Sequence, residues 1–528
     1  MSSPARNPSL AIALLVAFAA VSGGAQSPVA DSEVLDAMKR ASRFMVETVS
    51  TEGGYVWAYL PDRSRRWGEM EARETMIWIQ PPGTATVGHL FLDAYHATRD
   101  EYYYEAAEKV AAALIKAQHP SGGWNYMADF AGEKSLADWY ATIGRNGWRL
   151  EEFQHDWGNA TFDDAGTADS AKFLLRLFLE KRNDRYKTAL ANAVRFVIDS
   201  QYPIGGWPQR FPNGNSLRGA GKTDYTAYLT FNDDVAAENI DFLVMCYQTL
   251  GDKQLLDPIR RGMMAFVKLQ QSPPQAGWAL QYTPDLQPAG ARTYEPKALV
   301  THTTAANVSS LLRFHRLTGD ASFLATIPAA LSWLDSVALT PDVAAIAGGG
   351  RTHPTFVEIG SNRALYVHRT GSNVVNGRYF VDYDPRNTIG HYSAFRRIDT
   401  ADLRRRLEAA RAMTAEAAAK DSPLLAIPGT ISLPRFFTVT PDPPKLSARE
   451  VIASLNEQGY WLAPLGYNTH PYKGPGSAVV TPGSFGQTHV GDVFDTSPFP
   501  DPKLQGISIE AYVRNMGVLM RQLSNTPK

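Results

Sequence analysis

Two short acidic motifs of the same type stand in front of expected helices. Phe162-Asp163-Asp164 precedes a helix expected to begin near Ala168, and Phe231-Asn232-Asp233-Asp234 precedes one expected near Val235. Asp and Asn are favoured at helix N-termini, where they cap the helix and suit its dipole, so a purely structural role is open for each motif. Their matching positions in two similar stretches of chain favour a shared site. Convergent carboxylates of this kind can hold Ca²⁺ through hard oxygen ligands.

Arginines follow the acidic motifs along the chain. They lie in Arg292-Thr293-Tyr294-Glu295-Pro296, in Gly360-Ser361-Asn362-Arg363 and in His368-Arg369-Thr370-Gly371. Arginine binds carboxylates through two parallel hydrogen bonds, so arginines near a carboxylate-bound metal suit an acidic sugar. The plainer explanation for any one of them is a surface ion pair, such as one between Arg292 and Glu295.

A repeat of roughly 70–80 residues positions these motifs. Each copy has two helical stretches separated by a Gly or Asp break, followed by a Gly-Tyr or Gly-Trp turn. The helix pairs are expected at 90–95 with 104–117, 173–179 with 186–200, 240–249 with 255–269, and 308–317 with 323–337. One hairpin cannot bury its apolar face alone, so the copies must pack on one another. We therefore predict a mainly α fold, an (α/α) helical-hairpin toroid or barrel with short strands, whose loops meet at one mouth.

The tryptophans of the aromatic turns are expected to occupy equivalent places around this toroid. Trp124 and Trp278 should pack between hairpins. Trp207 is followed directly by Pro208 and Gln209, and we expect it to border the cleft as well.

The chain ends differ in character from the repeats. Residues 1–25 have the pattern of an export signal, with Arg6, a short apolar stretch and small residues before Gln26, which predicts a secreted or periplasmic protein. No later run reaches about 18 apolar residues, so we expect no transmembrane segment. Residues 26–395 are expected to form the toroid, and 396–528 a helical and irregular C-terminal extension that packs on it. Within the later chain we expect strands at 356–359 and 378–383, helices at 401–420, 448–458 and 508–524, and a wrapping or linking segment at 423–444.

The composition excludes some classes of function. The 528 residues carry 52 Lys and Arg against 53 Asp and Glu, a net charge of −1. This balance argues against a nucleic-acid binder driven by bulk charge. The one cysteine, Cys246, cannot form an internal disulfide or a cysteine-rich metal site.

The order of the motifs resembles the catalytic module of family 10 pectate lyases over roughly residues 150–395. The order is Phe-Asp-Asp, Gly-Gly-Trp-Pro-Gln (205–209), Phe-Asn-Asp, Arg-x-Tyr-Glu-Pro, then Glu-Ile-Gly-Ser-Asn-Arg (358–363). The resemblance implies an (α/α) barrel that cleaves de-esterified homogalacturonan by β-elimination with Ca²⁺. It also implies that Asp163 and Asp233 are the metal and substrate-site aspartates, Arg292 the general base, and Arg369 a substrate-carboxylate ligand. Further substrate contacts are expected from Arg363, Trp207, Gln209, Asn232 and Tyr294.

The sequence departs from the family pattern at some positions. Thr355 stands where the family usually has arginine, Gln281-Tyr282-Thr283 lacks the usual aspartate, and Val300–Thr304 replaces a Ser-Gly-Ser-Glu-Ser segment. We predict an exported, Ca²⁺-dependent lyase acting on polygalacturonate or a related uronate polymer. We expect a monomer that binds an acidic polysaccharide and neither nucleic acid nor membrane. Two alternatives stay open: a glycoside hydrolase with two carboxylates about 5–10 Å apart, and a catalytically silent glycan-binding protein, which the missing arginine at Thr355 supports.

Overall fold

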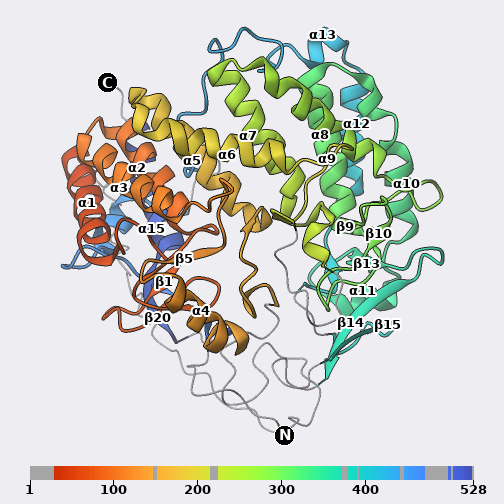
Figure 1. Ribbon diagram of the computed structural model, residues 1–528. Helices are drawn as coiled ribbons and strands as arrows, with labels where there is room; N and C mark the ends of the chain where they lie inside the picture. Colours follow the sequence, from red (N-terminus) through yellow and green to blue (C-terminus); the bar gives the residue numbers. More distant parts are fainter. Residues whose placement is uncertain are drawn as a thin grey trace, which may run out of the picture.

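The protein is a curved assembly of helical hairpins, seen in a computed structural model (Figure 1). The structure describes residues 29–146, 151–213, 224–370, 378–388, 392–440, 445–465, 467–469, 498–500 and 503–525, and the expected export signal at 1–25 lies outside them. The hairpins run from α2 and α3 through α5 and α6, then α7 and α8, to α9 and α10 (Figure 1). This order confirms the predicted mainly α fold of packed helical hairpins.

The helices of the hairpins fall where the periodicity predicts them. They are α2 (Thr84–Thr98), α3 (Glu101–Ala117), α5 (Gly166–Lys181), α6 (Lys187–Asp199), α7 (Val235–Leu250), α8 (Leu256–Lys268), α9 (Thr301–Thr318) and α10 (Ile327–Ser336). The other helices are α1 (Asp31–Phe44), α4 (Glu133–Thr142), α11 (Pro341–Ala347), α12 (Thr400–Arg411), α13 (Ala415–Ala418), α14 (Ala448–Ser454) and α15 (Ile509–Asn525). The single helix expected over 401–420 is wrong, because the hydroxyl of Thr414 accepts a hydrogen bond from the Ala417 N–H and caps a separate short helix, α13.

The strands are short and gather at one end of the helices. They are β1 (Ala58–Tyr59), β2 (Arg66–Trp67), β3 (Glu71–Ala72), β4 (Met76–Trp78), β5 (Met127–Asp129), β6 (Ala160–Thr161), β7 (Arg210–Phe211), β8 (Leu229–Thr230), β9 (Gln281–Tyr282), β10 (Pro288–Ala289), β11 (Leu299–Val300), β12 (His353–Pro354), β13 (Phe356–Val357), β14 (Ala364–Thr370), β15 (Arg378–Asp382), β16 (Phe395–Arg396), β17 (Leu462–Pro464), β18 (Tyr467–Thr469), β19 (Pro498–Pro500) and β20 (Gln505–Ser508). Among the described residues, these strands pair in antiparallel fashion. The strands predicted near 356–359 and 378–383 correspond to β13 and β15.

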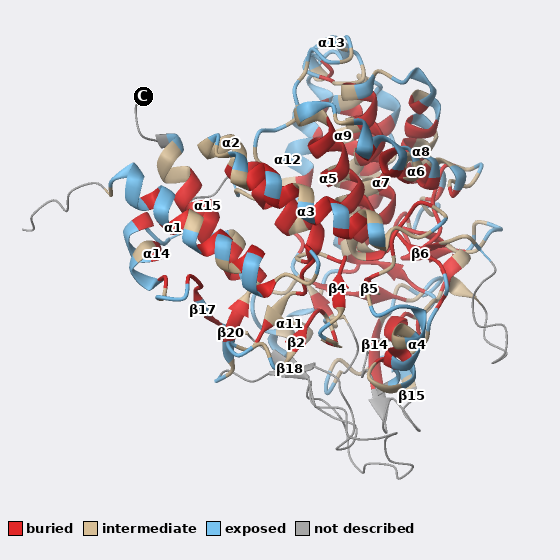
Figure 2. Ribbon diagram, turned by 60° about the vertical axis from the view of Figure 1, so that its left-hand side comes forward, coloured by how far each residue is buried: buried red, intermediate tan, exposed pale blue. Residues whose placement is uncertain are grey.

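Charged side chains join the first helices of successive hairpins. Arg176 of α5 contacts Asp93 of α2 at 2.7 Å. Lys172 of α5 pairs with Glu238 of α7, and Asp241 of α7 pairs with Arg313 of α9. Around these pairs the helices bury most of their apolar side chains (Figure 2). The row α2, α5, α7, α9 therefore runs continuously through the four hairpins.

The aromatic turns join each hairpin to the next one: the Trp124 backbone N–H donates to the Thr167 hydroxyl of α5 at 3.0 Å, and that of Trp278 to the Thr304 hydroxyl of α9 at 3.1 Å. Trp124, Trp207 and Trp278 have no exposed surface, and each indole N–H donates to a backbone carbonyl in the second helix of its own hairpin: Leu114, Val197 and Phe266. Their equivalent, buried places confirm the packing role predicted for Trp124 and Trp278.

Glycine is required in these turns because a neighbouring helix comes too close for a side chain. Gly122 has φ +106°, and a Cβ there would meet the Asn192 carbonyl oxygen of α6 at 2.3 Å. Gly205 has φ +113°, and its Cβ would meet the Arg261 oxygen of α8 at 1.9 Å. Both the left-handed backbone and the close approach select glycine.

The described part of the proline-rich segment, at 423–440, wraps across one end of the helices. The N–H groups of Phe437 and Thr438 and the Thr438 hydroxyl all donate to the buried Asp93 carboxylate, which also pairs with Arg176. The His89 ring stacks on Phe437 with centroids 5.2 Å apart. These contacts hold the later chain against α2 and α5.

The C-terminal helix α15 packs against α1 and α2 at the start of the chain. The strand β20, which directly precedes α15, pairs with β1, with Tyr59 opposite Ile507. The two ends of the described chain therefore share one region of the core, on the left of Figure 1.

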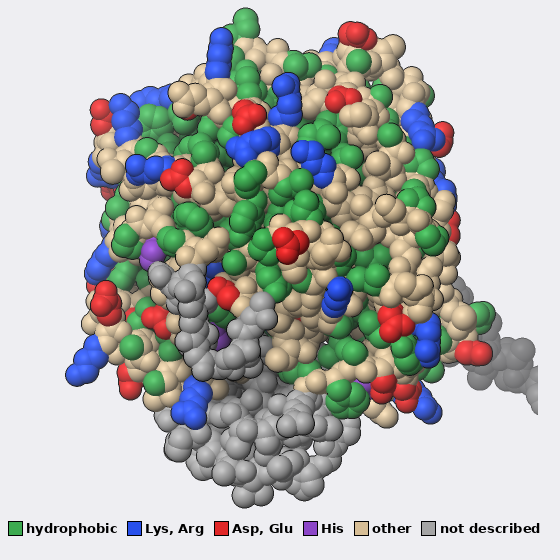
Figure 3. All heavy atoms as spheres, turned by 45° about the vertical axis from the view of Figure 1, so that its right-hand side comes forward, with side chains coloured by type: hydrophobic (Ala, Val, Ile, Leu, Met, Phe, Trp, Pro, Cys, Tyr) green, Lys and Arg blue, Asp and Glu red, His purple; other side chains and the backbone are tan. Residues whose placement is uncertain are grey.

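The surface carries mixed charge. On the face shown in Figure 3, Lys and Arg side chains are interspersed with Asp and Glu. In the described part of the chain, no single helix is long and apolar enough to cross a membrane; one bent pair, Ala321–Ser336 with Pro341–Ala347, passes that test by length and composition.

Candidate active site

The first helices of the hairpins all begin at the same end of the fold. The strand leading into each of them pairs with the strand that follows the next aromatic turn. In this way Thr161 lies opposite Arg210, and Thr230 lies opposite Gln281. The pairs β4–β5 and β11–β13 repeat the arrangement for α2 and α9. The side chains that precede these helices are therefore brought to one mouth, as the repeat predicts.

The two acidic motifs have the same backbone. Asp164 and Ala165 have φ of 52° and 59°, and Asp233 and Asp234 have φ of 49° and 55°. Two consecutive left-handed residues other than glycine are uncommon, although Asp tolerates this conformation better than most residues. Strain of this kind is often concentrated at functional sites.

The backbone pairing fixes which residues of the two motifs correspond. The Phe162 N–H donates to the Gln209 oxygen at 2.9 Å, and the Phe231 N–H donates to the Leu280 oxygen at 2.8 Å. Asp163 is thus equivalent to Asn232, and Asp164 to Asp233. The two residues that the resemblance pairs as metal ligands, Asp163 and Asp233, come from non-equivalent positions of their loops.

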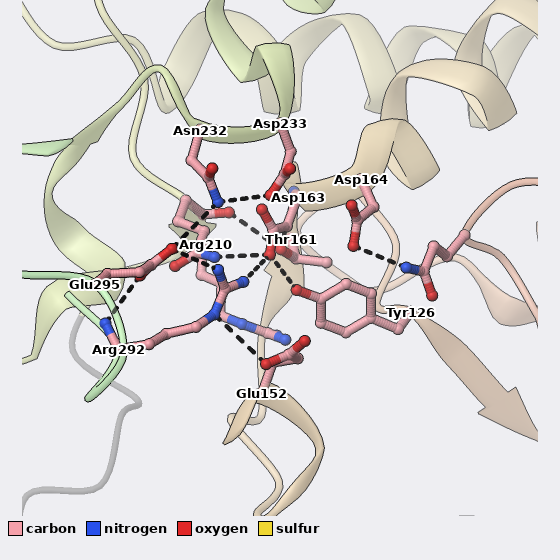
Figure 4. Close-up of polar contacts among 12 residues, drawn as sticks. Tyr126, Glu152, Thr161, Asp163, Asp164, Arg210, Asn232, Asp233, Arg292 and Glu295 are labelled. Carbon is pink, nitrogen blue, oxygen red and sulfur yellow. Dashed lines mark hydrogen bonds and ion pairs between the residues drawn. The ribbon is translucent and has the colours of Figure 1, made fainter. Parts of the chain in front are cut away.

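Arg292 is the centre of the site. Its guanidinium has almost no exposed surface and is surrounded by carboxylates: Nη1 lies 3.0 Å from Glu295 Oε1, Nε lies 3.4 Å from Glu152 Oε2, and Nη2 contacts Asp163 Oδ2 (Figure 4). The plain ion pair with Glu295 therefore exists, but it is buried and belongs to a larger network. Burial alone would lower the pKa of Arg292, but the neighbouring Tyr294 and these three carboxylates raise it well above its usual value.

Asp163 accepts most of the hydrogen bonds at this centre. Its Oδ2 receives the Tyr126 hydroxyl, the Gln209 amide at 2.7 Å and Arg292 (Figure 4). Burial would raise the pKa of Asp163, but Arg292 and these donors, with a hydrogen bond from Asp233, keep it below its usual value. Asp163 is therefore the ionised member of the group.

Asp233 is the protonated partner of Asp163. Burial, with the charges of Asp164 and Asp163, raises its pKa well above the usual range, and its carboxyl is hydrogen-bonded to Asp163. Two carboxyl groups this close share one proton because both cannot be charged. The structure thus brings together the two aspartates that the sequence predicts to line one cleft.

Asn232 links the second loop to the arginine. Its amide donates to Asp233 at 2.6 Å and to the Tyr392 hydroxyl at 2.9 Å, and it approaches Glu295 Oε1 at 3.5 Å. The Tyr392 hydroxyl in turn donates to Glu295 at 2.9 Å. Asn232 and Arg292 consequently share one carboxylate acceptor.

A second acidic group borders the first. The Gln80 amide donates to Asp164 at 2.7 Å and to Glu69 at 2.8 Å. Burial, and next the charge of Asp163, raises the pKa of Asp164 to about 8. Burial, and next the charge of Asp164, also raises the pKa of Glu69. Asp164 therefore carries a proton at neutral pH.

Arg210 is a second buried arginine beside this centre. It is 1% exposed and its Nη1 donates to the neutral oxygens of Asn125 and Asn159, at 3.2 and 3.4 Å. Its guanidinium carbon lies 5.0 Å from the centre of the Tyr126 ring. The charge of Arg210 thereby lies next to the tyrosine that donates to Asp163.

Two of the residues predicted to contact substrate, Trp207 and Tyr294, are buried in the core. Trp207 is 0% exposed, and its indole N–H is bonded to Val197. Tyr294 is 1% exposed, and its hydroxyl lies 3.2 Å from Glu152. Both side chains support the site from within the core, and their contact with substrate stays a prediction.

The other predicted contacts fall in different places. Gln209 and Asn232 are buried and hold the carboxylates of the cluster. Arg363 is exposed in the turn between β13 and β14, where its guanidinium stacks 3.3 Å from the centre of the Tyr383 ring. Arg369 belongs to β14, but its side chain lies outside the described part of the structure. Their contact with substrate stays a prediction.

Several residues of the site were not predicted from the sequence. They are Glu69, Gln80, Tyr126, Glu152, Arg210 and Tyr392, while Asp164 belongs to a predicted motif but was given no role of its own. Tyr126 could have been found, because it stands two residues after Trp124 just as Gln209 stands two residues after Trp207. Glu152 and Tyr392 carry no local signal.

The electrostatics argue against the base role that the resemblance implies for Arg292. A base must give up its proton first, and the surrounding carboxylates stabilise the charged guanidinium instead. This arrangement favours Arg292 as a fixed positive charge.

The carboxylate oxygens at this centre fit part of a calcium site. Asp163 Oδ1 is buried and has no hydrogen-bond donor from the described residues, and it belongs to the carboxylate that is paired with Asp233. Ca²⁺ prefers oxygen ligands and takes about six to eight of them. Among the described residues, no group of three or more His, Cys, Asp or Glu side chains is arranged to hold a metal ion. Asp163 and Asp233 would therefore supply only part of the ligand set.

The fold and the site define a helical-hairpin toroid with a buried arginine–carboxylate centre at one mouth. Residues 134–380 match the family described as pectic acid lyase, which confirms the resemblance for this part of the chain and supports a pectate lyase-like enzyme. Gln80 and Tyr126 lie before the matched range and complete the site from outside it.

Solved structures with a similar fold have low sequence identity. A family 10 polysaccharide lyase from Cellvibrio cellulosa is 18% identical, covers 62% of this chain and 98% of its own, and has a TM-score of 0.41. A variant of that lyase in complex with trigalacturonic acid is 19% identical, with 57% and 96% covered and a TM-score of 0.37. Cellobiose 2-epimerase from Spirochaeta thermophila is 13% identical, with 63% and 74% covered and a TM-score of 0.40. No curated protein matches the chain.

Proposed function

We propose that the protein is an exported, Ca²⁺-dependent lyase that cleaves polygalacturonate or a closely related uronate polymer by β-elimination. The observation that carries this proposal is the buried guanidinium of Arg292, fixed among three carboxylates at the mouth of a pectic acid lyase module. The expected export signal at 1–25 supports secretion or a periplasmic location.

The residues of the site suit this chemistry. In β-elimination a base takes the C5 proton of a uronate, and negative charge develops toward the C6 carboxylate. A double bond then forms between C4 and C5 as the bond from C4 to its glycosidic oxygen breaks, and the departing oxygen takes up a proton. Arg292 would stabilise that charge from a fixed position, which requires no reorganisation during the reaction. Asp163 and Asp233 would hold Ca²⁺, which would polarise the substrate carboxylate when bound. Tyr126 and Gln209 hold Asp163 in place, both for its contact with Arg292 and for Ca²⁺.

The carboxyl pair does not suit a glycoside hydrolase. Hydrolases place two carboxyl groups about 5–10 Å apart, with the scissile bond between them. The carboxyls of Asp163 and Asp233 are instead hydrogen-bonded to each other. This pair leaves no room for a glycosidic bond, so the hydrolase alternative would need other carboxylates.

The test is the ultraviolet absorbance of unsaturated uronate products on polygalacturonate. We expect absorbance to rise with added Ca²⁺ and to stop when a chelator is present. A hydrolase would release reducing ends without this absorbance, and a silent binding protein would release neither. Either result would reject the proposed reaction.

Variants of Arg292 sharpen the same assay. Lysine keeps the charge but cannot contact Asp163, Glu295 and Glu152 together, because it has no planar fork of donors. We expect Arg292→Lys to lower turnover by roughly 10²–10³-fold, nearly as much as Arg292→Ala. Near-normal turnover of the Lys variant would show that charge alone is enough and that the fixed fork is unnecessary.

A further inference from the structure

Arg396 is a half-buried arginine at the edge of the site. It lies in β16, which pairs with β12 so that Arg396 is opposite His353. Its Nε donates to the Thr355 hydroxyl at 3.1 Å. Within the described residues, its two terminal nitrogens have no hydrogen-bond acceptor and the guanidinium has no carboxylate within ion-pair distance. Burial lowers the pKa of Arg396, Tyr392 partly offsets this, and the charge of Arg351 lowers the pKa further.

Thr355 fixes the direction of this guanidinium. Thr355 is 0% exposed, and its hydroxyl donates to the Ser393 carbonyl while it accepts from Arg396. The hydroxyl therefore uses its hydrogen in one bond and a lone pair in the other. The hydrogen bond to Nε leaves the outer edge of the guanidinium, with its terminal N–H groups, available for another partner.

The guanidinium stands next to the acidic centre. Its carbon lies 5.9 Å from the centre of the Tyr392 ring, and the Tyr392 hydroxyl contacts Glu295 at 2.9 Å and Arg292 at 3.3 Å. Arg396 consequently borders the acidic centre through Tyr392.

His302 marks the same border on α9. It is the second residue of that helix, and its ring centre lies 6.5 Å from that of Tyr392. Burial, and next the positive charge of Arg396, lowers the pKa of His302 to about 3. His302 is therefore neutral and does not compete with Arg396 for an anion.

The carboxylate of a sugar beside the reacting one needs a cation other than Arg292. Arg292 already contacts three protein carboxylates, whereas Arg396 contacts none. We propose that Arg396 binds a carboxylate of the uronate chain beside the reacting sugar, and that Thr355 is the positioning residue that aims it. This inference rests on the proposed uronate substrate. It assigns the recognition of a neighbouring acidic sugar to a residue of β16, after the end of the matched module.

The first test compares binding and kinetics of Arg396→Gln with those of Arg397→Gln. Arg397 is the adjacent, exposed residue of the same chain segment and has no hydrogen bond or ion pair among the described residues. The probes are trigalacturonic acid and polygalacturonate, with a methyl-esterified chain as the uncharged comparison. We expect Arg396→Gln to weaken binding of trigalacturonic acid and raise KM about 10- to 100-fold, the range for a lost charge-assisted hydrogen bond. The value of kcat should change less, and Arg397→Gln should behave as the parent protein.

The esterified chain separates charge recognition from damage to the fold. Its binding should be nearly the same in the parent and in Arg396→Gln, because it offers no carboxylate to Arg396. An equal loss on both chains, or unchanged binding of trigalacturonic acid, would overturn the proposal. Binding is measured without catalysis, so the inference can fail while the lyase activity is observed, and it can hold while that activity is absent.

Thr355 variants test the positioning role and serve if Arg396→Gln does not fold. Thr355→Val keeps the shape but removes the hydroxyl, and should raise KM for polygalacturonate severalfold with little change in kcat. Thr355→Ser restores the hydroxyl and should restore KM. Arg396→Lys, which keeps the charge without the fork, should fall between the parent and Arg396→Gln. A Thr355→Val protein with normal KM, or no rescue by serine, would show that Thr355 does not aim Arg396.

Discussion

The loops at 162–166 and 231–235 share a backbone but hold different charges. Both place two consecutive residues in the left-handed region before a helix, and both hydrogen-bond to the next aromatic turn in the same register. At the equivalent buried position, one loop has Asp163 and the other has Asn232. Asp163 accepts from Arg292, whereas Asn232 donates to the carboxylates on the other side. A repeated local structure thus builds an asymmetric site by exchanging one acceptor for one donor.

Removing the carboxylate of Asp163, the acceptor in the first loop, should have the largest effect. Asp163→Ala removes one partner of a buried ion pair and leaves the Tyr126 and Gln209 donors without their acceptor. We expect a loss of about 3–5 kcal/mol of stability, because uncompensated buried charge is costly. Denaturant unfolding should show a much smaller loss for Asn232→Ala, about 1 kcal/mol, since Glu295 keeps Arg292 and Tyr392 as donors. Equal losses would mean that the two positions are energetically equivalent.

The second prediction separates two adjacent aspartates of the second loop. Asp233→Asn keeps the left-handed backbone but weakens the expected calcium site, and should lower Ca²⁺-stimulated turnover by roughly 10²–10³-fold, as for loss of one group that stabilises developing charge. The matched control is Asp234→Ala: Asp234 is exposed, and the equivalent residue of the first loop is already alanine, Ala165. Turnover as a function of Ca²⁺ concentration should be near normal for this control. A comparable defect in both variants would indicate damage to the loop.

Making the second loop like the first, with Asn232→Asp, should destabilise the protein less than Asp163→Ala does. Asn232→Asp replaces the donor that faces Asp233, Glu295 and Tyr392 with an acceptor. We expect a cost of about 1–3 kcal/mol in denaturant unfolding, the range for a buried polar group left without its partner. Asn232→Gln keeps the amide and is the comparison variant. If Asn232→Asp were as stable as the parent protein, the asymmetry between the loops would have no energetic basis.

The smallest effect concerns pH and Asp164, which is equivalent to Asp233. The pKa of Asp164 is raised to about 8 in the fold, against an ordinary value near 3.8. The folded state therefore holds a proton that the unfolded state has lost, and this contribution to stability is full below about pH 4 and disappears as pH rises through about 8. Asp164→Asn should match the parent Tm near pH 4 and exceed it by a few degrees near pH 8, with chelator present. Thermal unfolding of Asp285→Asn, an exposed loop residue, should show no such divergence.

Much of the architecture could be predicted because its signals are local. Helical periodicity placed α3, α6, α7 and α8 within a few residues. For α2 and α5 it found only the central parts, at 90–95 and 173–179. The Gly-Trp turns identified the repeat, and the repeat placed Asp163, Asp233 and Arg292 at one mouth. The continuous helix at 401–420 was wrong because one threonine hydroxyl starts a new helix there.

By itself, the sequence determined the hairpins, the repeat and the acidic residues in front of the helices, since each depends on neighbours a few positions apart. Only the tertiary structure decided the partners of those residues. Arg292 meets Asp163 across 129 positions of the chain, and Asn232 meets Tyr392 across 160. Burial among these partners also set the charges, protonating Asp233 and Asp164 while holding Arg292 charged, because the free energy of a charge depends on the dielectric surroundings and the nearby ions. The pairing of Arg396 with Thr355 across 41 positions has the same origin: it is set by how β16 packs beside β12.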